Sequence, residues 1–362
     1  MKNYVLKLSI IATICLIVYG CKKDNAQGLE EVFSTTPYQL TYGRLPTPII
    51  PIDNPLTKEG VALGRMLFYE NKLSRNNTQS CASCHKQAFA FSDTNKFSIG
   101  INGLKGKRHA MAIFNMAWHT NEFFWDGRAH LLRDQAILPI QDPLEMDESV
   151  ANVVAKLLIM PNYTAQFKRA FGSNAINSLL ISKALEQFMN SIVSHSSKYD
   201  DFLDNKVALT ADEERGRYLF FTEFNPGFPS ISGADCNHCH GGANFENDQY
   251  MNNGLDLDIA LKDSGRHAVT KAQKDIGAFK VTSLRNIALT PPYMHDGRFN
   301  TLLEVVNHYN LVKNSQSLDP SFKQQLPIGL NLSQADKLAL VAFLNTFTDY
   351  KLLENSAFSN PF

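Results

Sequence analysis

Apolar residues recur at helical spacing in two long segments of the chain, residues 176–193 and 333–347. They fall three or four positions apart, which places them on one face of a helix. Ser333 followed by Asp336 adds an N-terminal cap to the second segment. The pattern therefore predicts two amphipathic helices that pack into a core. The apolar positions of the first segment are Leu179, Leu180, Leu185, Phe188, Met189 and Ile192.

A repeated motif predicts a second pair of helices. The motif reads LGRMLF at residues 63–68 and RGRYLF at residues 215–220. Thr57 and Thr210 stand before these segments as N-caps, and Thr210 with Glu213 fits a capping box. Strand signals are weak throughout, so the pattern predicts an all-α protein with few short strands.

The repeat continues downstream of these helices. NMA at residues 115–117 leads to WDGR at 125–128, and NIA at 286–288 leads to HDGR at 295–298 at nearly the same offset. Two tandem units of one ancestral fold explain these matches. The predicted organisation is a first domain over residues 52–205, a second domain over 206–350 and a C-terminal tail over 351–362.

The charge of the chain excludes one class of partner, and its length bounds the number of domains. The 362 residues contain 35 Lys and Arg and 35 Asp and Glu, so the formal net charge is +0. The chain has no basic block, and nucleic acid is therefore not a natural partner. The length is sufficient for two domains with their own cores.

The N-terminus has the pattern of an export signal. Lys2 and Lys7 precede an apolar run over residues 9–19, which closes on Gly20 and Cys21. This resembles a bacterial lipoprotein signal, in which the cysteine becomes the acylated first residue. An ordinary signal peptide is the alternative. The apolar run is short for a membrane span.

These features predict the cellular location. We expect a lipoprotein-type signal peptide over residues 1–20, acylation of Cys21, and a polar, then Pro-rich tether over residues 22–51. The mature protein is then a periplasmic lipoprotein, anchored by its lipid to a membrane of the cell envelope.

Two cysteine motifs carry the candidate chemistry. Cys-x-x-Cys-His occurs at residues 81–85 and again at residues 236–240. Two thiols three positions apart can both add to the vinyl groups of one porphyrin, and the imidazole of the next residue then reaches the iron. The motifs predict two covalently bound haem c groups. The attachment cysteines are Cys81, Cys84, Cys236 and Cys239, and the iron ligands are His85 and His240.

Other uses of the cysteines fit less well. A four-cysteine zinc site usually brings its pairs within about 15 to 20 residues, and these pairs stand in different halves of the chain. A thioredoxin-like pair would follow a strand that leads into a βαβ unit, and no such pattern surrounds either motif. Of the six cysteines, Cys15 belongs to the signal and Cys21 to the lipid, so none remains for a disulfide.

The residues around the motifs resemble a known family. They read FWDGRA at 124–129, PLEM at 143–146, LRN at 284–286 and PYMHDG at 292–297, together with Gln135. This set resembles the bacterial dihaem cytochrome c peroxidase and MauG family, and the resemblance runs from about residue 52 to about residue 350. It implies two tandem class I cytochrome c-like haem domains, with the active site near their interface.

The resemblance implies roles for individual residues. His85 becomes the proximal ligand of the first, peroxidatic haem, with Glu145 and Gln135 on the distal side. Cleavage of hydrogen peroxide requires a proton to move between its oxygens, and a partly desolvated carboxylate is a suitable acid and base. Trp125 resembles the tryptophan between the two haems, whereas Trp118 is interpreted as a core aromatic. Arg128 and Arg298 pair either with haem propionates or with the aspartates of their own DGR turns.

Two departures from typical members indicate the subtype. In peroxidases that need prior reduction, a histidine that blocks the first iron follows the Ser-Ile-Gly segment at residues 98–100. Here Ile101 stands at that position, and an apolar side chain cannot ligate iron. The usual methionine ligand of the second haem is replaced by Tyr309, and a phenolate favours ferric iron. Met294, His308 and Met251 are the alternative ligands.

Calcium is a further group that the resemblance implies. In the family an asparagine after an arginine helps to hold it between the haems, but here Arg108 is followed by His109, a poor ligand for a hard cation. The backbone carbonyls of Lys280 and Thr282 remain as candidate ligands, so one Ca²⁺ is in doubt.

The resulting hypothesis is a peroxidase that reduces hydrogen peroxide to water without reductive activation. Its electrons would come from a small periplasmic cytochrome or copper protein and enter at the His240 haem. One alternative is a MauG-like enzyme that oxidises residues of a protein substrate, and another is a non-enzymatic dihaem electron carrier. Dimers are common in the family, so a homodimer is a further expectation.

Overall fold

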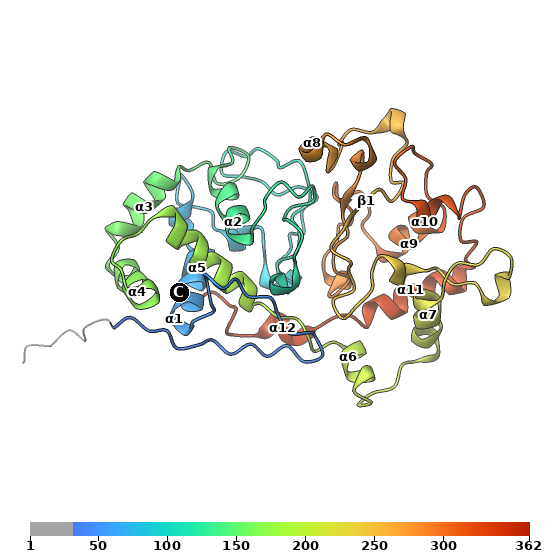
Figure 1. Ribbon diagram of the computed structural model, residues 1–362, viewed down its shortest axis with the longest axis horizontal. Coiled ribbons are helices and arrows are strands. Elements are labelled where there is room, and N and C mark those ends of the chain that lie inside the picture. Colours follow the sequence, from blue (N-terminus) through green and yellow to red (C-terminus); the bar gives the residue numbers. More distant parts are fainter. Residues whose placement is uncertain (1–31) are drawn as a thin grey trace, which may run out of the picture. The chain divides into compact units, whose positions relative to one another are not determined.

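Helices dominate residues 32–362, which are the residues that the computed structural model describes (Figure 1). The predicted signal peptide, Cys15 and Cys21 lie outside them. The first half of the chain contains α1 (Lys58–Tyr69), α2 (Leu132–Gln141), α3 (Val150–Leu158), α4 (Pro161–Phe171) and α5 (Ser178–Ser191). The second half contains α6 (Lys198–Leu203), α7 (Ala211–Phe221), α8 (His267–Thr270), α9 (Leu302–Asn310), α10 (Pro320–Lys323), α11 (Gln334–Asn345) and α12 (Tyr350–Glu354).

The predicted all-α class with few short strands is confirmed. Within residues 32–362, the only strands are β1 (Tyr250–Met251) and β2 (Phe279–Lys280), which pair antiparallel with Tyr250 opposite Lys280. Thr57, Thr210 and Ser333 cap α1, α7 and α11 through their side chains, as predicted.

The chain builds two hydrophobic cores, and we call their surroundings the first lobe (α1–α5) and the second lobe (α6–α11). In the first lobe α1 packs along α5, and in the second α7 packs along α11 (Figure 1). A Cβ atom added at Gly64 would lie 1.9 Å from the Ala184 carbonyl oxygen, and one at Gly216 would lie 2.0 Å from that of Ala339. The repeated glycine therefore permits the same close helix approach in both lobes.

The segment before α1, predicted as the end of a tether, is packed where the structure describes it. Ser34 N donates to the Arg169 carbonyl oxygen at 3.0 Å, and Tyr38 N donates to that of Leu56 at 3.0 Å. Leu45 is buried. Residues 34–45 therefore lie against the first lobe.

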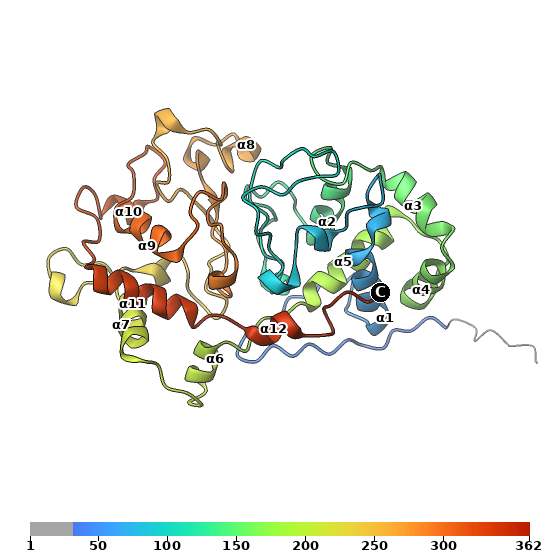
Figure 2. The same ribbon diagram turned by 180° about the vertical axis from the view of Figure 1, so that it is seen from behind.

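The predicted C-terminal tail also returns to the first lobe. After α11 the chain leaves the second lobe, forms α12 and ends beside α1 (Figure 2). Leu352 and Phe358 are buried among the core residues of the first lobe. The two lobes are therefore joined by two crossings of the chain, one before α6 and one before α12.

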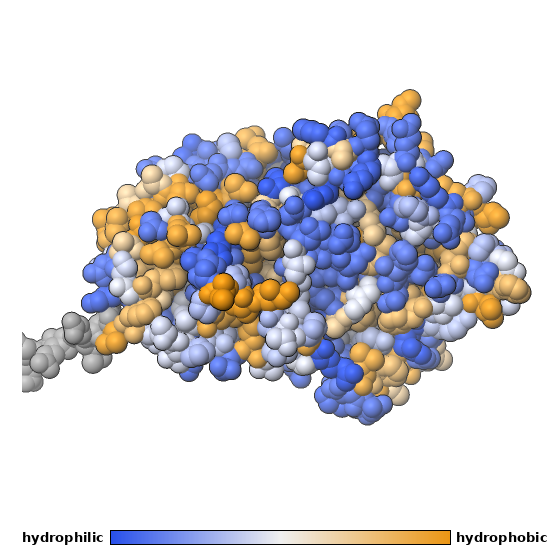
Figure 3. Space-filling model, in the orientation of Figure 1, coloured by the Kyte–Doolittle hydropathy of each residue, from blue (hydrophilic) through white to orange (hydrophobic). Residues whose placement is uncertain are grey.

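No helix within residues 32–362 is both long enough and apolar enough to cross a membrane. On the face drawn in Figure 3, hydrophobic residues gather in several patches between hydrophilic areas. Exposed apolar side chains include Ile52 and Ile259, and such groups are ordinary on protein surfaces.

Candidate functional site

Both Cys-x-x-Cys-His motifs fold into the same short turn. Cys81–Ser83 and Cys236–His238 are 3₁₀ helices. His85 N donates to the Cys81 carbonyl oxygen at 2.9 Å, and His240 N donates to that of Cys236 at 2.9 Å. Two distant segments of the sequence therefore build matching backbone turns.

A cavity lies at each motif. The first adjoins Cys84 and His85, and a smaller neighbouring cavity is lined by these two residues and Cys81. The second is lined by Cys236, Cys239 and His240. Within residues 32–362, no group of three or more His, Cys, Asp or Glu side chains is placed to hold a metal ion by itself. The four-cysteine zinc alternative is therefore not supported.

A backbone carbonyl lies at Nδ1 of each motif histidine. His85 Nδ1 lies 3.0 Å from the carbonyl oxygen of Phe91, and His240 Nδ1 lies 3.3 Å from that of Phe245. A carbonyl accepts a hydrogen bond from Nδ1–H, and in this tautomer the ring lone pair lies on Nε2. The backbone at Met111 also hydrogen-bonds His85, and the backbone at Thr282 also hydrogen-bonds His240. Burial lowers the pKa of His85 and lowers that of His240 to about 4, which favours the neutral form of both rings. Neutral imidazoles beside paired thiols fit a c-type haem at each cavity.

The predicted distal residues meet at the first cavity. Gln135 projects from α2, and Glu145 follows in the turn after that helix, where its N–H donates to the Asp142 carbonyl oxygen at 2.9 Å. Both line the same two cavities as Cys84 and His85. The structure thus brings together residues that stand 50 to 60 positions apart.

Glu145 has an unusual electrostatic environment. Burial raises the pKa of its carboxyl group to about 7, and the negative charge of Asp142 adds to the effect while Arg128 opposes it. A carboxyl group with a pKa near neutrality exchanges protons readily at physiological pH. Glu145 therefore has the protonation behaviour that an acid and base at this cavity would need.

The loop that carries Ile101 is packed onto Glu145. Ile101 N donates to the Glu145 carbonyl oxygen at 2.9 Å, and Gly100 N donates to that of Leu104 at 2.9 Å. A Cβ atom at Gly100 would lie 2.1 Å from the Leu144 carbonyl oxygen, so only glycine permits this approach. Ile101 itself is not among the residues that line the cavities.

Trp125 lines both the first and the second cavity. Its indole Nε1 donates to the His109 carbonyl oxygen at 2.8 Å, and its own carbonyl oxygen accepts from Lys280 N at 2.9 Å. The side chain is therefore fixed between the two sites. Trp118 differs from its predicted core position, because it is half-buried beside Tyr42 and its indole donates to the Pro46 carbonyl oxygen.

Tyr309 lines the second cavity together with Met294 and Met251. Its hydroxyl oxygen accepts a hydrogen bond of 3.1 Å from Asn253 Nδ2, and burial raises its pKa to about 12. Met251 Sδ lies 3.4 Å from Cys239 Sγ and therefore stands beside one of the two thiols of the second motif. His308 does not line this cavity, and its Nε2 lies 3.1 Å from the Asn253 carbonyl oxygen. Tyr309 and Met294 are therefore better placed than His308 as ligands.

Two of the three candidate calcium ligands have other hydrogen-bond partners. His109 Nε2 lies 2.9 Å from the Asp93 carbonyl oxygen, and its own carbonyl accepts from Trp125. The backbone at Thr282 hydrogen-bonds His240. Lys280 directs a buried ammonium group to Asp248 and to the Asn121 carbonyl oxygen. Imidazole is a poor ligand for a hard cation, and His109 and Thr282 already have hydrogen-bond partners, so this set does not favour calcium.

The DGR arginines contact the acidic residues of their own turns. Arg128 Nη1 lies 3.0 Å from Asp126 Oδ1, and Arg298 pairs with both Asp296 and Asp256 at 2.7 to 2.8 Å. These pairs support the interpretation of both arginines as turn residues. Arg128 also lines the first cavity.

Sequence reasoning missed three residues that shape these sites. Phe91 and Phe245 follow the motif histidines by six and five positions, so the internal repeat contained a signal for them. Asn253 has no such counterpart, and only the fold places it beside Tyr309.

Comparison with known proteins places these features among relatives. A family model described as di-haem cytochrome c peroxidase matches residues 58–208. The chain is 35% identical over 298 residues to the methylamine utilization protein MauG of Methylorubrum extorquens, with 82% of this chain and 80% of that protein covered. It is 35% identical over 317 residues to the cytochrome c551 peroxidase of Nitrosomonas europaea, with 84% and 86% covered.

A solved structure extends the likeness to three dimensions. The crystal structure of a MauG-like protein associated with microbial copper homeostasis matches with a TM-score of 0.80 and 33% sequence identity. The match covers 90% of this chain and 99% of that one. Both lobes and the junction between them therefore have counterparts in a known fold.

Proposed function

The chain belongs to the di-haem cytochrome c peroxidase and MauG family, and on that premise we propose that it reduces hydrogen peroxide to water without prior reductive activation. Membership makes it a peroxidase-type oxidoreductase with two c-type haems. The proposed electron donor is a small periplasmic cytochrome or copper protein. The single observation that carries the proposal is that Glu145 and Gln135 line the cavity of His85 while Ile101 does not.

The haem held at residues 81–85 supplies an iron centre that binds a peroxide oxygen and exchanges single electrons. The carboxylate of Glu145 takes the proton from the inner peroxide oxygen and returns it to the outer one, which leaves as water. Its pKa near 7 allows both transfers at neutral pH. The amide of Gln135 hydrogen-bonds peroxide at the cavity wall.

The Ile101 loop keeps the first cavity accessible. Because Ile101 is tied through its backbone to the Glu145 carbonyl oxygen, the loop also orients the catalytic turn. No side chain that ligates iron stands at this position. Peroxide therefore meets an open site in the oxidised protein.

The second site passes electrons to the first. Each turnover requires two electrons and two protons, which with one hydrogen peroxide give two water molecules. The proposed route enters at the His240 site and crosses at Trp125, whose side chain lines both cavities. Tyr309 would hold the second haem together with His240, and the hydrogen bond from Asn253 would favour its phenolate form.

The test uses the purified, oxidised holoprotein. It is mixed with hydrogen peroxide, with and without prior reduction, and peroxide loss is followed with reduced cytochrome c or a reduced copper protein as donor. We expect rapid loss in both preparations. Turnover that appears only after reduction would contradict the activation-free proposal.

Oxidation of a protein substrate at long range is the second candidate. It is favoured by the position of Tyr309 at the second cavity and by the similarity to MauG. Peroxide reactivity of the oxidised protein without turnover by any small donor would favour this candidate over the peroxidase. The lipid anchor, the periplasmic location and a homodimer remain part of the proposal.

A further inference from the structure

Both motif histidines depend on a phenylalanine with unusual backbone geometry. The carbonyl oxygens of Phe91 and Phe245 accept hydrogen bonds from Nδ1 of His85 and His240. Both phenylalanines have positive φ angles, of 59° and 52°. A bulky residue rarely adopts this left-handed region, and it does so only where its surroundings hold it there. The packing around these two side chains therefore decides whether the carbonyls stay directed at the histidines.

In the first lobe the C-terminal segment packs against Phe91. The rings of Phe91 and Phe358 have centroids 6.4 Å apart and meet edge to face at 74°. Phe358 is 5% exposed, and its carbonyl oxygen accepts from Tyr69 Oη at 2.8 Å. Arg65 Nε donates to the next carbonyl oxygen, that of Ser359, at 2.6 Å.

The same segment contacts the chain just after the first motif. Gln87 Nε2 donates to the carbonyl oxygens of Leu352 and Asn355 at 3.0 and 2.9 Å. Gln87 stands two positions after His85, in the turn that leads to Phe91. Both ends of this turn are therefore bonded to, or packed against, residues 352–358.

In the second lobe an earlier part of the same segment packs against Phe245. The rings of Phe245 and Phe347 stack with centroids 4.0 Å apart at 19°. Phe347 is fully buried, and its carbonyl oxygen accepts from Asn286 N at 3.0 Å. Eleven positions thus separate Phe347, which packs on Phe245, from Phe358, which packs on Phe91.

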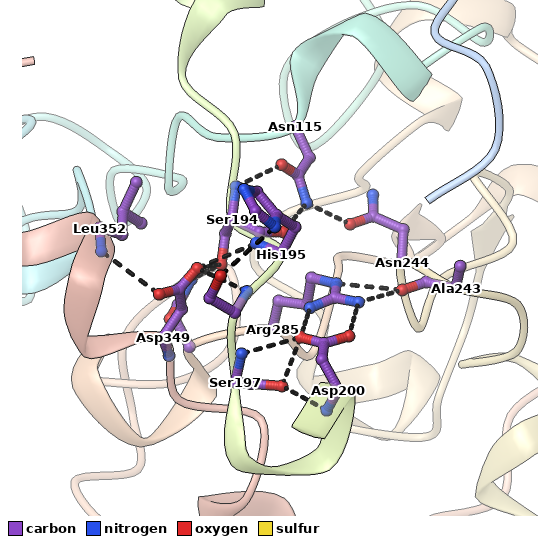
Figure 4. A network of polar contacts seen from close by, with 12 residues as sticks. Asn115, Ser194, His195, Ser197, Asp200, Ala243, Asn244, Arg285, Asp349 and Leu352 are labelled. Atoms are coloured by element: carbon purple, nitrogen blue, oxygen red, sulfur yellow. Dashed lines mark hydrogen bonds and ion pairs between the residues drawn. The ribbon is translucent and has the colours of Figure 1, made fainter. Parts of the chain in front are cut away.

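Between these two rings the segment is fixed at the crossing between the lobes (Figure 4). Asp349 Oδ2 accepts from Ser194 Oγ at 3.2 Å, His195 N at 2.9 Å and Ser196 N at 3.0 Å. These donors belong to the other crossing of the chain, after α5. The segment is therefore held at its start, its middle and its end.

We propose that residues 347–358 form a C-terminal brace that positions both iron-ligating histidines. Phe347 and Phe358 hold Phe245 and Phe91 in their strained conformations, so that each carbonyl accepts the Nδ1 proton of its histidine. That hydrogen bond increases the electron donation of imidazole to iron and favours the ferric state. The inference rests on the proposed ligand roles of His85 and His240, and it makes Phe347 and Phe358 positioning residues.

The experiment compares Phe358→Ala with wild-type holoprotein and with Phe362→Ala, a control at an exposed ring. Potentiometric titration measures the reduction potential of each haem, and resonance Raman spectroscopy of the reduced protein measures the iron–histidine stretching band. In Phe358→Ala we expect a higher potential and a lower stretching frequency at the first haem only. Phe347→Leu should raise the potential of the second haem only.

The outcomes separate the inference from the proposed function. Unchanged potentials and bands in folded Phe358→Ala would overturn the brace, as would equal shifts at both haems, which indicate general loosening. If Phe347→Leu does not fold, Phe358→Ala alone decides. A wild-type protein without histidine-ligated haem at either motif would instead overturn the proposed function.

Discussion

The indole Nε1 of Trp125 donates a hydrogen bond of 2.8 Å to the carbonyl oxygen of His109. Both residues line the first and the second cavity, so this bond fixes an aromatic ring at the boundary between the two haem sites. The backbone of Trp125 is held from the other side by Lys280 N. An aromatic ring at this boundary is suited to electron transfer between the sites.

Replacing Trp125 by Phe tests this role. We expect slower electron transfer between the haems, followed by stopped-flow spectroscopy, and a stability loss of about 1 kcal/mol for the lost hydrogen bond. Trp118→Phe is the matched control, because its indole also donates to a carbonyl, that of Pro46 at 2.8 Å, but lines neither cavity. Equal electron-transfer rates in wild type and both variants would exclude a role for the Trp125 ring.

Replacing Glu145 by Gln tests the acid and base. The variant keeps the size of the side chain but cannot accept the proton, so peroxide turnover should fall about 10²- to 10⁴-fold. The control is Glu148→Gln, whose carboxylate is buried against Lys156 and lines no cavity. Glu148→Gln should reduce stability and leave the turnover of the folded protein intact. Full activity in Glu145→Gln would assign proton transfer to another group.

The pH dependence of turnover should report the same carboxyl group. Burial raises the pKa of Glu145 to about 7, and the carboxylate is the form that accepts the proton. The rate should therefore fall as pH drops below about 7, and this limb should be absent from Glu145→Gln. The folded-state pKa of Glu145 lies above its ordinary value of 4.5. The stability of the fold should therefore fall as pH rises from about 4.5 to about 7, because ionisation of this buried carboxyl group is less favourable in the folded state than in the unfolded chain.

Local patterns in the sequence were sufficient to predict the main helices, and the haem attachment sites remain a prediction from two such patterns. The caps at Thr57 and Thr210 are side-chain to backbone bonds within one turn, so they can be predicted without the fold. The reason for the repeated Gly64 and Gly216 could not be predicted in this way, because the carbonyls that approach them belong to helices more than 100 residues away in the sequence. Helix propensity alone would have opposed a glycine there.

The environment of each site depends on segments that no local pattern connects. Asn253 reaches Tyr309 across 56 positions, and Phe358 reaches Phe91 across 267. Lys280 illustrates the same limit, because the sequence offers its carbonyl as a candidate ligand but does not show that its ammonium group is paired with Asp248. Contacts of this kind depend on tertiary packing, which the periodicity of a single chain does not specify.

Replacing Tyr309 by Phe tests the ligand of the second haem. Loss of the phenolate should raise the reduction potential of that haem and change its spectrum, because phenolate stabilises ferric iron. The control is Tyr293→Phe, which lines the same cavity and donates its hydroxyl proton to the Ile287 carbonyl oxygen at 3.0 Å. An unchanged spectrum and potential in Tyr309→Phe would leave Met294 as the best placed alternative ligand.

Replacing Arg285 by Leu tests the polar junction beside the second site (Figure 4). Arg285 donates to both carboxylate oxygens of Asp200 at 2.8 and 2.9 Å, and both residues are buried. Removal of the guanidinium leaves a buried carboxylate without its charge partner, so the free energy of unfolding should fall by about 3–5 kcal/mol in urea titrations at pH 7. The control is Arg217→Leu, which removes an exposed pair with Glu214 and should cost less than about 1 kcal/mol.

The difference between Arg285→Leu and wild type should depend on pH. Burial opposes ionisation of Asp200, but Arg285 outweighs it and lowers the carboxyl pKa below its ordinary value of 3.8. In wild type this pair therefore contributes stability above that value, and the contribution is lost as pH falls through the folded-state pKa. In the variant, burial raises the Asp200 pKa against only the remaining Ser197 hydrogen bonds, so the carboxyl group takes up a proton more readily and the penalty shrinks on acidification. Urea titrations should show a smaller difference in unfolding free energy between wild type and Arg285→Leu at about pH 4.5 than at pH 7. An equal difference at both pH values would mean that Asp200 does not remain buried and charged without Arg285.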